Sequence, residues 1–131
     1  NELVETNENV AFETTLATKS DKAKIAEAKS KNYNVTLLFF WLQNVELAIE
    51  RVKTRVLEGG HNIETEVIKR RYLNGIKNLF DIYLPIADEV MIFDNSEGKH
   101  DLIAKKTLET EIDIFSETKF NKLKNYYHGN T

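Results

Sequence analysis

Two pairs of arginines flank a glycine-rich turn, and they are the residues best suited to chemistry on phosphate groups. Arg51 and Arg55 stand four residues apart, so they share one face of a helix that ends at two glycines. Arg70 and Arg71 lie early on the helix that follows. A guanidinium group matches the geometry of phosphate oxygens and stays charged throughout a reaction. The segment 58–66 is therefore a candidate lid over a polyphosphate; the alternative is that these arginines lie on solvated helix faces beside several glutamates.

Three polar residues mark the end of a short apolar run, which predicts a buried strand. Glu13 could orient a substrate hydroxyl or a magnesium-bound water, and Thr14 and Thr15 could donate hydrogen bonds to substrate oxygens. Alternatively, the carboxylate accepts hydrogen bonds from backbone amides in the turn, and the threonines cap that turn. Spacing alone leaves both interpretations open.

Two further polar residues lie in or next to predicted turns. His61 comes directly after the two glycines and could contact a phosphate group, although an isolated loop histidine more often fixes the shape of its loop. Asp94 ends a predicted strand and could bind a ligand in the crevice beyond the sheet, but Asp-Asn-Ser is equally typical of a turn. The chain has no cysteine and its three histidines are scattered, so we predict no metal site built from its side chains.

The elements that would position these residues alternate between strand and helix. Apolar runs predict strands over 10–14, 35–41, 89–93 and 100–107. Helical spacing and capping residues predict helices over 23–31, from 44 to the two glycines, from 65 to near Pro85, and over 117–127. This order is typical of an α/β domain with crossover connections, in which ligands bind beyond the carboxyl ends of the strands.

The strongest predicted strand, over 35–41, has apolar residues that do not alternate with polar ones. Such a run predicts that both faces of the sheet are covered, as in a parallel sheet. The helix that begins at 65 has a predicted buried stripe at helical spacing. Its members are Ile68, Tyr72, Ile76, Leu79 and Tyr83.

Composition excludes several classes of protein. A chain of 131 residues with 41% hydrophobic residues fits one domain with a real core. The net charge of −3 gives no global field to hold nucleic acid or an anionic membrane. The longest apolar run, 35–42, has the length of a strand and not of a membrane span. We therefore predict a cytoplasmic protein with no nucleic-acid and no membrane partner.

Three stretches together resemble the zeta-toxin-like group of P-loop ATPases and kinases. They are Phe12-Glu13-Thr14-Thr15-Leu16, then Leu38-Phe39-Phe40-Trp41-Leu42, then a long signature from Glu46 to Asn78. That signature combines Arg-Val-x-x-Arg, Gly-Gly-His and Arg-Arg-Tyr, which is far more specific than any one of these pieces. The resemblance covers roughly Val10 to Thr107.

The resemblance implies a P-loop NTPase-like, mostly parallel sheet flanked by helices. It also implies ATP- and Mg²⁺-dependent transfer of phosphate to a hydroxyl of a small molecule, such as a nucleotide sugar, with an antitoxin protein as a partner. The resemblance implies that the catalytic lid residues are among Arg55, Arg70 and Arg71, and that Glu13 is the carboxylate on the substrate side. Their place at the strand end predicts Thr14 and Thr15 as further substrate-binding residues. The predicted cofactor contacts are Arg51, His61 and Asp94.

The chain departs from the family pattern at one decisive point. No Gly-x-x-x-x-Gly-Lys-Ser/Thr occurs, so nothing here can wrap the β- and γ-phosphates of ATP. The family places its first, central strand, the phosphate loop and a catalytic aspartate ahead of the Glu-Thr-Thr strand. We therefore expect 1–131 to be a single partial domain, incomplete at its N-terminal side, whose other half lies upstream of Asn1.

Two consequences follow from that missing half. Loss of the central strand predicts two neighbouring strands with unpaired edges and a core that is open between the helices. Alone, the chain is predicted to be inactive as a kinase. The alternatives are a non-catalytic remnant that binds a nucleotide or a protein without turnover, and an interaction module whose helices pack on another chain.

Overall fold

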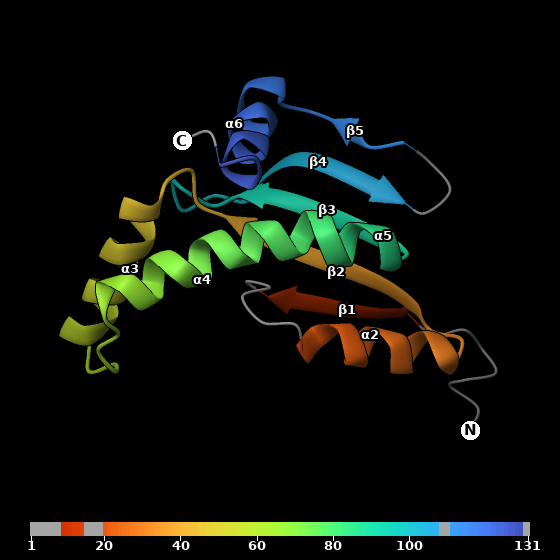
Figure 1. Cartoon of the computed structure of the whole chain (residues 1–131), viewed down its shortest axis with the longest axis horizontal. Helices are drawn as coiled ribbons and strands as arrows, with labels where there is room; N and C mark the ends of the chain where they lie inside the picture. The colour runs from red at the N-terminus through yellow and green to blue at the C-terminus, as the bar shows by residue number, and fades with distance from the viewer. Residues whose placement is uncertain (1–8, 15–19, 108–110, 130–131) are drawn as a thin grey trace.

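Strands and helices alternate along the chain (Figure 1). The computed structural model describes residues 9–14, 20–107 and 111–129, with side chains from residue 22 onward. The elements are β1 (Asn9–Thr14), α2 (Ser20–Ser30), β2 (Asn34–Trp41), α3 (Val45–Leu57), α4 (Thr65–Asn78), the π-helical turn η1 (Leu79–Tyr83), α5 (Leu84–Ile86), β3 (Glu89–Asp94), β4 (Asp101–Thr107), β5 (Asp113–Ile114) and α6 (Glu117–Tyr127).

The strands form one sheet in the order β1-β2-β3-β4-β5. The pairs β1/β2 and β2/β3 are parallel, whereas β3/β4 and β4/β5 are antiparallel. The α/β class is therefore as predicted, but the sheet is mixed. Its parallel strands are joined by the helices α2 and α3–α5, as crossover connections require. The antiparallel part begins where a short loop replaces a helix after β3.

The expectation of two unpaired neighbouring strands in the middle of the sheet is wrong for the described residues. β2 and β3 pair with each other directly, from Thr36 opposite Glu89 to Trp41 opposite Asp94. Pairing of this kind satisfies backbone amides and carbonyls that would otherwise be buried without partners. The core beneath is continuous, because buried side chains of both strands belong to one cluster with those of the helices.

The expectation that both faces of the sheet are covered is also wrong for the described elements. Burial alternates strictly along β2, where Leu37, Phe39 and Trp41 are buried while Leu38 and Phe40 are half-buried. β3 alternates in the same way. Helix α4 crosses in front of the strands in Figure 1, and buried side chains of α2, α4 and α5 belong to the same core cluster as those of β2 and β3. The unbroken apolar run in β2 thus has one half-exposed side.

The helices begin and end close to where their capping residues predict. Asn44 caps α3, since its side-chain oxygen accepts a hydrogen bond from Leu47 N–H at 2.9 Å. The predicted helix from 65 to near Pro85 is present, but its end is π-helical: Leu84 N–H donates to the Leu79 carbonyl. Pro85 has no N–H to continue an α-helical ladder at this point, which favours the wider turn. The described part of the chain contains no helix long and apolar enough to cross a membrane.

Candidate ligand pocket at the end of strand β2

A pocket of ≈ 480 Å³ lies beside the carboxyl end of β2, where α3 and α4 meet the sheet. β1 ends opposite Phe39, so the last residues of β2 have no partner on that side among the described strands. The lining residues are Phe39, Phe40, Trp41, Leu42, Ala48, Arg51, Val52, Arg55, Ile63, Ile68, Arg71, Tyr72, Ile76, Asn95 and His100. The location matches the strand-end crevice in which α/β proteins bind ligands.

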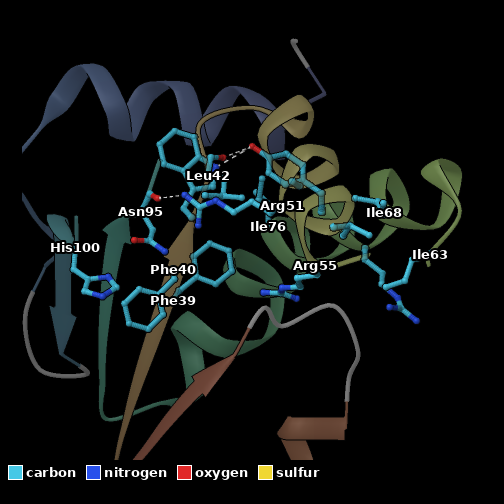
Figure 2. A pocket seen from close by; sticks show the side chains of 15 residues that line it. Phe39, Phe40, Leu42, Arg51, Arg55, Ile63, Ile68, Ile76, Asn95 and His100 are labelled. Atoms are coloured by element: carbon cyan, nitrogen blue, oxygen red, sulfur yellow. Dashed lines mark hydrogen bonds between the residues drawn. The ribbon is translucent and has the colours of Figure 1, made fainter. Parts of the chain in front are cut away.

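Arg51 fastens helix α3 to the ends of two strands. Its Nη2 donates to the Asn95 carbonyl at 2.7 Å, and the Asn95 N–H donates to the Trp41 carbonyl at 2.8 Å. Figure 2 shows the dashed Arg51–Asn95 contact next to the side chains of Phe39 and Phe40. Arg51, which the sequence predicts as a cofactor contact, therefore lines the pocket with one nitrogen already bonded to the protein.

Tyr72 fastens helix α4 to the same strand end. Its hydroxyl donates to the Leu42 carbonyl at 2.6 Å and accepts from Trp41 Nε1 at 3.1 Å. Burial raises the pKa of Tyr72, so the phenol stays protonated and keeps donating. Sequence reasoning placed Tyr72 in a core stripe and missed its contact with the pocket, because a half-buried tyrosine and a core tyrosine have the same helical spacing.

Arg55 and Arg71 bring two further guanidinium groups to the lining. Both residues are exposed, and neither side chain has a hydrogen-bond or ion-pair partner among the described residues. Arg70 is exposed as well, but it does not line the pocket. The structure thus brings together two of the three arginines predicted to act in catalysis. Their donors are available for anionic oxygens of a ligand.

The two glycines end helix α3 in a Schellman motif. The N–H of Gly60 donates to the Arg55 carbonyl at 2.6 Å, and the N–H of Gly59 donates to the Val56 carbonyl at 3.0 Å. Gly59 has a φ of 97°, which favours glycine. A Cβ at position 60 would stand 2.8 Å from the Arg55 carbonyl oxygen. Both glycines are therefore required locally to end the helix that carries Arg55.

His61 follows this cap, is exposed, and does not line the pocket. The opening movement of segment 58–66 stays a prediction. Glu13 and Thr14 end β1 in register with Leu38 and Phe39, at the border of the pocket, but their side chains lie outside the described residues. Thr15 lies outside the described residues altogether.

Asp94 lies at the end of β3, buried and engaged by protein groups on both carboxylate oxygens. Ser96 donates to Oδ1 through its hydroxyl at 2.5 Å and its N–H at 3.0 Å. Gln43 Nε2 donates to Oδ2 at 2.8 Å, and Lys119 Nζ lies 2.9 Å from the same oxygen. Burial by itself would raise the pKa of Asp94, but the hydrogen bonds from Ser96, Lys119 and Gln43 outweigh it and lower the pKa. Asp94 is outside the pocket lining, so its role as a cofactor contact stays a prediction.

The donor set of the pocket fits an organic phosphate but not a magnesium ion. Its walls are mostly aliphatic and aromatic, its charged groups are arginines, and no carboxylate lines it. Within the described residues no cluster of three or more histidine, aspartate or glutamate side chains could hold a metal ion. Asp94 has no free oxygen to offer. The arginines match the phosphate groups of ATP or of a phosphorylated substrate, whereas the described side chains that line the pocket offer Mg²⁺ no carboxylate.

Comparison with known proteins agrees with the resemblance found in the sequence. The model of the family described as Zeta toxin matches residues 1–108. An uncharacterized protein of Haemophilus influenzae is 35% identical over 61 residues, which are 47% of this chain and 44% of that protein. The match thus spans less than half of that relative. No solved structure matches the chain.

Proposed function

Because the chain belongs to the zeta toxin family, which its match over residues 1–108 shows, we propose that it forms part of an ATP-dependent kinase. The kinase transfers a phosphoryl group to a hydroxyl of a small molecule, for which a nucleotide sugar is one candidate. The single observation that carries this proposal is the pair of guanidinium groups, Arg55 and Arg71, that line the apolar pocket at the end of β2 and have no partner among the residues that the structure describes.

Catalysis of phosphoryl transfer depends mainly on positioning and on charge neutralisation. Bound ATP would supply the phosphoryl group. In this proposal Arg55 and Arg71 neutralise the charge on its oxygens, and Arg51 and Tyr72 keep their helices fixed on the strand ends.

The remaining predicted residues have supporting parts in this proposal. Glu13, with Thr14 and Thr15, orients the acceptor hydroxyl from the end of β1. Arg70 and His61 act as outer contacts when segment 58–66 closes. The proposed setting is the cytoplasm, with an antitoxin protein as a regulatory partner.

A binding experiment on the chain itself tests the phosphate site. We expect pyrophosphate to bind the wild-type chain in a salt-dependent manner. Titration calorimetry at low ionic strength measures this binding. Arg55→Ala and Arg71→Ala should each weaken binding by at least about fivefold, because a charge-assisted hydrogen bond contributes on the order of 1.5–3 kcal/mol. The matched control is Lys69→Ala, an exposed cation on the same helix outside the lining, which should bind within about twofold of wild type. Equal effects of Lys69→Ala and Arg71→Ala would contradict the assignment.

A second candidate function is a binding module without turnover. The observation that favours it is the direct pairing of β2 with β3, which leaves no gap for a further strand between them. The two functions differ in what lies upstream of Asn1 and in turnover. An in-frame strand followed by Gly-x-x-x-x-Gly-Lys-Ser/Thr, with phosphoryl transfer from labelled ATP by the protein that contains it, supports the kinase. If pyrophosphate binds but the protein that contains the upstream sequence transfers no phosphoryl group from ATP, the result supports a binding module without turnover.

A further inference from the structure

Helix α6 lies beyond residues 1–108, to which the family match is confined, and yet it contacts Tyr72, which holds α4 on the sheet, and Asp94, which directly precedes the residue whose carbonyl binds Arg51. Near its start, Lys119 Nζ lies 2.9 Å from Asp94 Oδ2 and 3.5 Å from Asp101 Oδ2. Near its end, the ring of Tyr126 packs edge-on against the ring of Tyr72, with 5.4 Å between their centroids. Phe120 and Leu123 anchor the helix between these two contacts in the core.

The Lys119 contact reaches the pocket through a short chain of hydrogen bonds. Asp94 holds Ser96 through two bonds, and the Ser96 hydroxyl accepts from the backbone N–H of Gln43 at 2.9 Å. Asn95, which lies between Asp94 and Ser96 in the sequence, presents the carbonyl that accepts a hydrogen bond from Arg51. The position of that carbonyl is therefore set by the carboxylate that Lys119 neutralises.

The Tyr126 contact acts on the other anchor. Tyr72 must point its hydroxyl at the Leu42 carbonyl while it accepts a bond from the indole of Trp41. A tyrosine side chain has few torsions, so a ring packed against its face or edge restricts the direction of its hydroxyl. Tyr126 supplies this packing from a different helix.

The ion pair between Asp94 and Lys119 matters because a buried carboxylate is costly without its cation. Asp94 is 2% exposed, and the Lys119 side chain is 30% exposed. A buried carboxylate that loses its cation either takes up a proton or draws in water, and both changes alter the hydrogen bonds that it accepts. Docking of α6 is thus coupled to the geometry of the strand-end loop.

We propose that Lys119 and Tyr126 are positioning residues of the pocket: they hold the Asn95 carbonyl and the Tyr72 hydroxyl where these fix Arg51 and α4. Helix α6 then positions groups of the ligand site, in addition to packing in the core. The ligand class is that of the proposed function, on which this inference rests in that respect only.

Local hydrogen exchange, measured by NMR, tests the positioning directly. In Lys119→Met the backbone N–H of Asn95 should exchange at least about tenfold faster, and in Tyr126→Ala the indole N–H of Trp41, the chain's one tryptophan, should do the same. Lys119→Arg and Tyr126→Phe should restore most of the protection. Lys122→Met, an exposed lysine on the same helix, is the matched control and should change neither probe.

Amides of the β2/β3 ladder, such as those of Leu37 and Val90, report global stability in the same spectra. Acceleration at Asn95 or Trp41 with an unchanged ladder supports the proposal, and the same variants should then weaken pyrophosphate binding by at least about threefold. Uniform acceleration of all amides, or wild-type exchange at both probes, overturns it. Absence of pyrophosphate binding by the wild type, with local exchange as expected, would instead refute the proposed function and leave the positioning role standing.

Discussion

Two adjacent arginines on α4 lie in different surroundings, although the sequence presents them as a pair. Arg71 lies three residues after Ile68 and precedes Tyr72, and all three line the pocket. Arg70 is turned away by the rotation of about 100° between successive helical residues and does not line it. The sequence signature predicts an arginine at this site. It cannot choose between the two, because the choice depends on which face of α4 meets the sheet.

Asp94 provides a prediction about pH at the same scale. The hydrogen bonds to its carboxylate lower the pKa of Asp94 in the folded chain below the ordinary value of an aspartate, so the ionised form stabilises the fold at any pH above that ordinary value. This stability is lost as the pH falls through the lower, folded pKa. Asp94→Asn should lower the free energy of unfolding by about 2–3 kcal/mol near neutral pH and should flatten its dependence on pH below about 4. Urea unfolding at several pH values measures both effects.

The control for this variant is Asp101→Asn, whose carboxylate is half-exposed and lies 3.5 Å from the same lysine. It should cost less than about 1 kcal/mol, as exposed ion pairs do. Equal losses in the two variants would show that Lys119 and not the Asp94 network carries the stability.

At the scale of elements, the cap of α3 decides where Arg55 points. Gly60→Ala should lower the thermal stability and weaken pyrophosphate binding by at least about threefold, because its Cβ would stand 2.8 Å from the Arg55 carbonyl oxygen and would unwind the last turn. Gly98→Ala is the control: Gly98 has a φ of 77° and open space around its Cβ position, so it introduces strain outside the pocket lining. If Gly60→Ala lowers stability but leaves pyrophosphate binding unchanged, the cap of α3 does not position Arg55 for the ligand.

The sequence predicts the long elements well and the short ones poorly. The bounds of α6 agree with the prediction of 117–127, since Ser116 caps the helix and its apolar residues recur at helical spacing. Strand β5, Asp113–Ile114, is too short to show a pattern of its own and exists because β4 offers a free edge. The sequence predicts that the helix ends near Pro85, but not that the Leu84 N–H donates to the Leu79 carbonyl and makes that end π-helical.

The pocket was predicted in place but not in composition. The rule for α/β sheets predicts a ligand at the strand ends, and guanidinium chemistry predicts the arginines; Arg51, Arg55 and Arg71 line the pocket there. Tyr72 and His100 were missed as lining residues, and the bond between Arg51 and Asn95 was not predicted, because these roles depend on contacts between elements that are distant in sequence. For Asn95 the signal was its place directly after Asp94, where the strand-end crevice was expected.

At the scale of the whole molecule, the pairing of β2 with β3 is the feature that the sequence could not predict. Both strands carry apolar runs that would suit a neighbour of either kind, so local pattern does not specify the partner. The pairing decides whether the strands form one continuous sheet or two parts separated by a gap between β2 and β3. It bears on the choice between a kinase half and a self-sufficient binding module.

Hydrogen exchange along β3 distinguishes the closed sheet from the gap. Successive amides of a strand point to opposite sides, so β3 directs alternate N–H groups toward β2 and toward β4. With both neighbours paired, the interior amides from Val90 to Phe93 should all exchange slowly, on the order of a hundredfold slower than those of the loop at Gly98. β1, which has a described neighbour on one side only, should show protection at every second residue and serves as the internal control. Alternating protection in β3 as well would mean that β2 and β3 separate in solution, and the chain would then present an open site for a further strand.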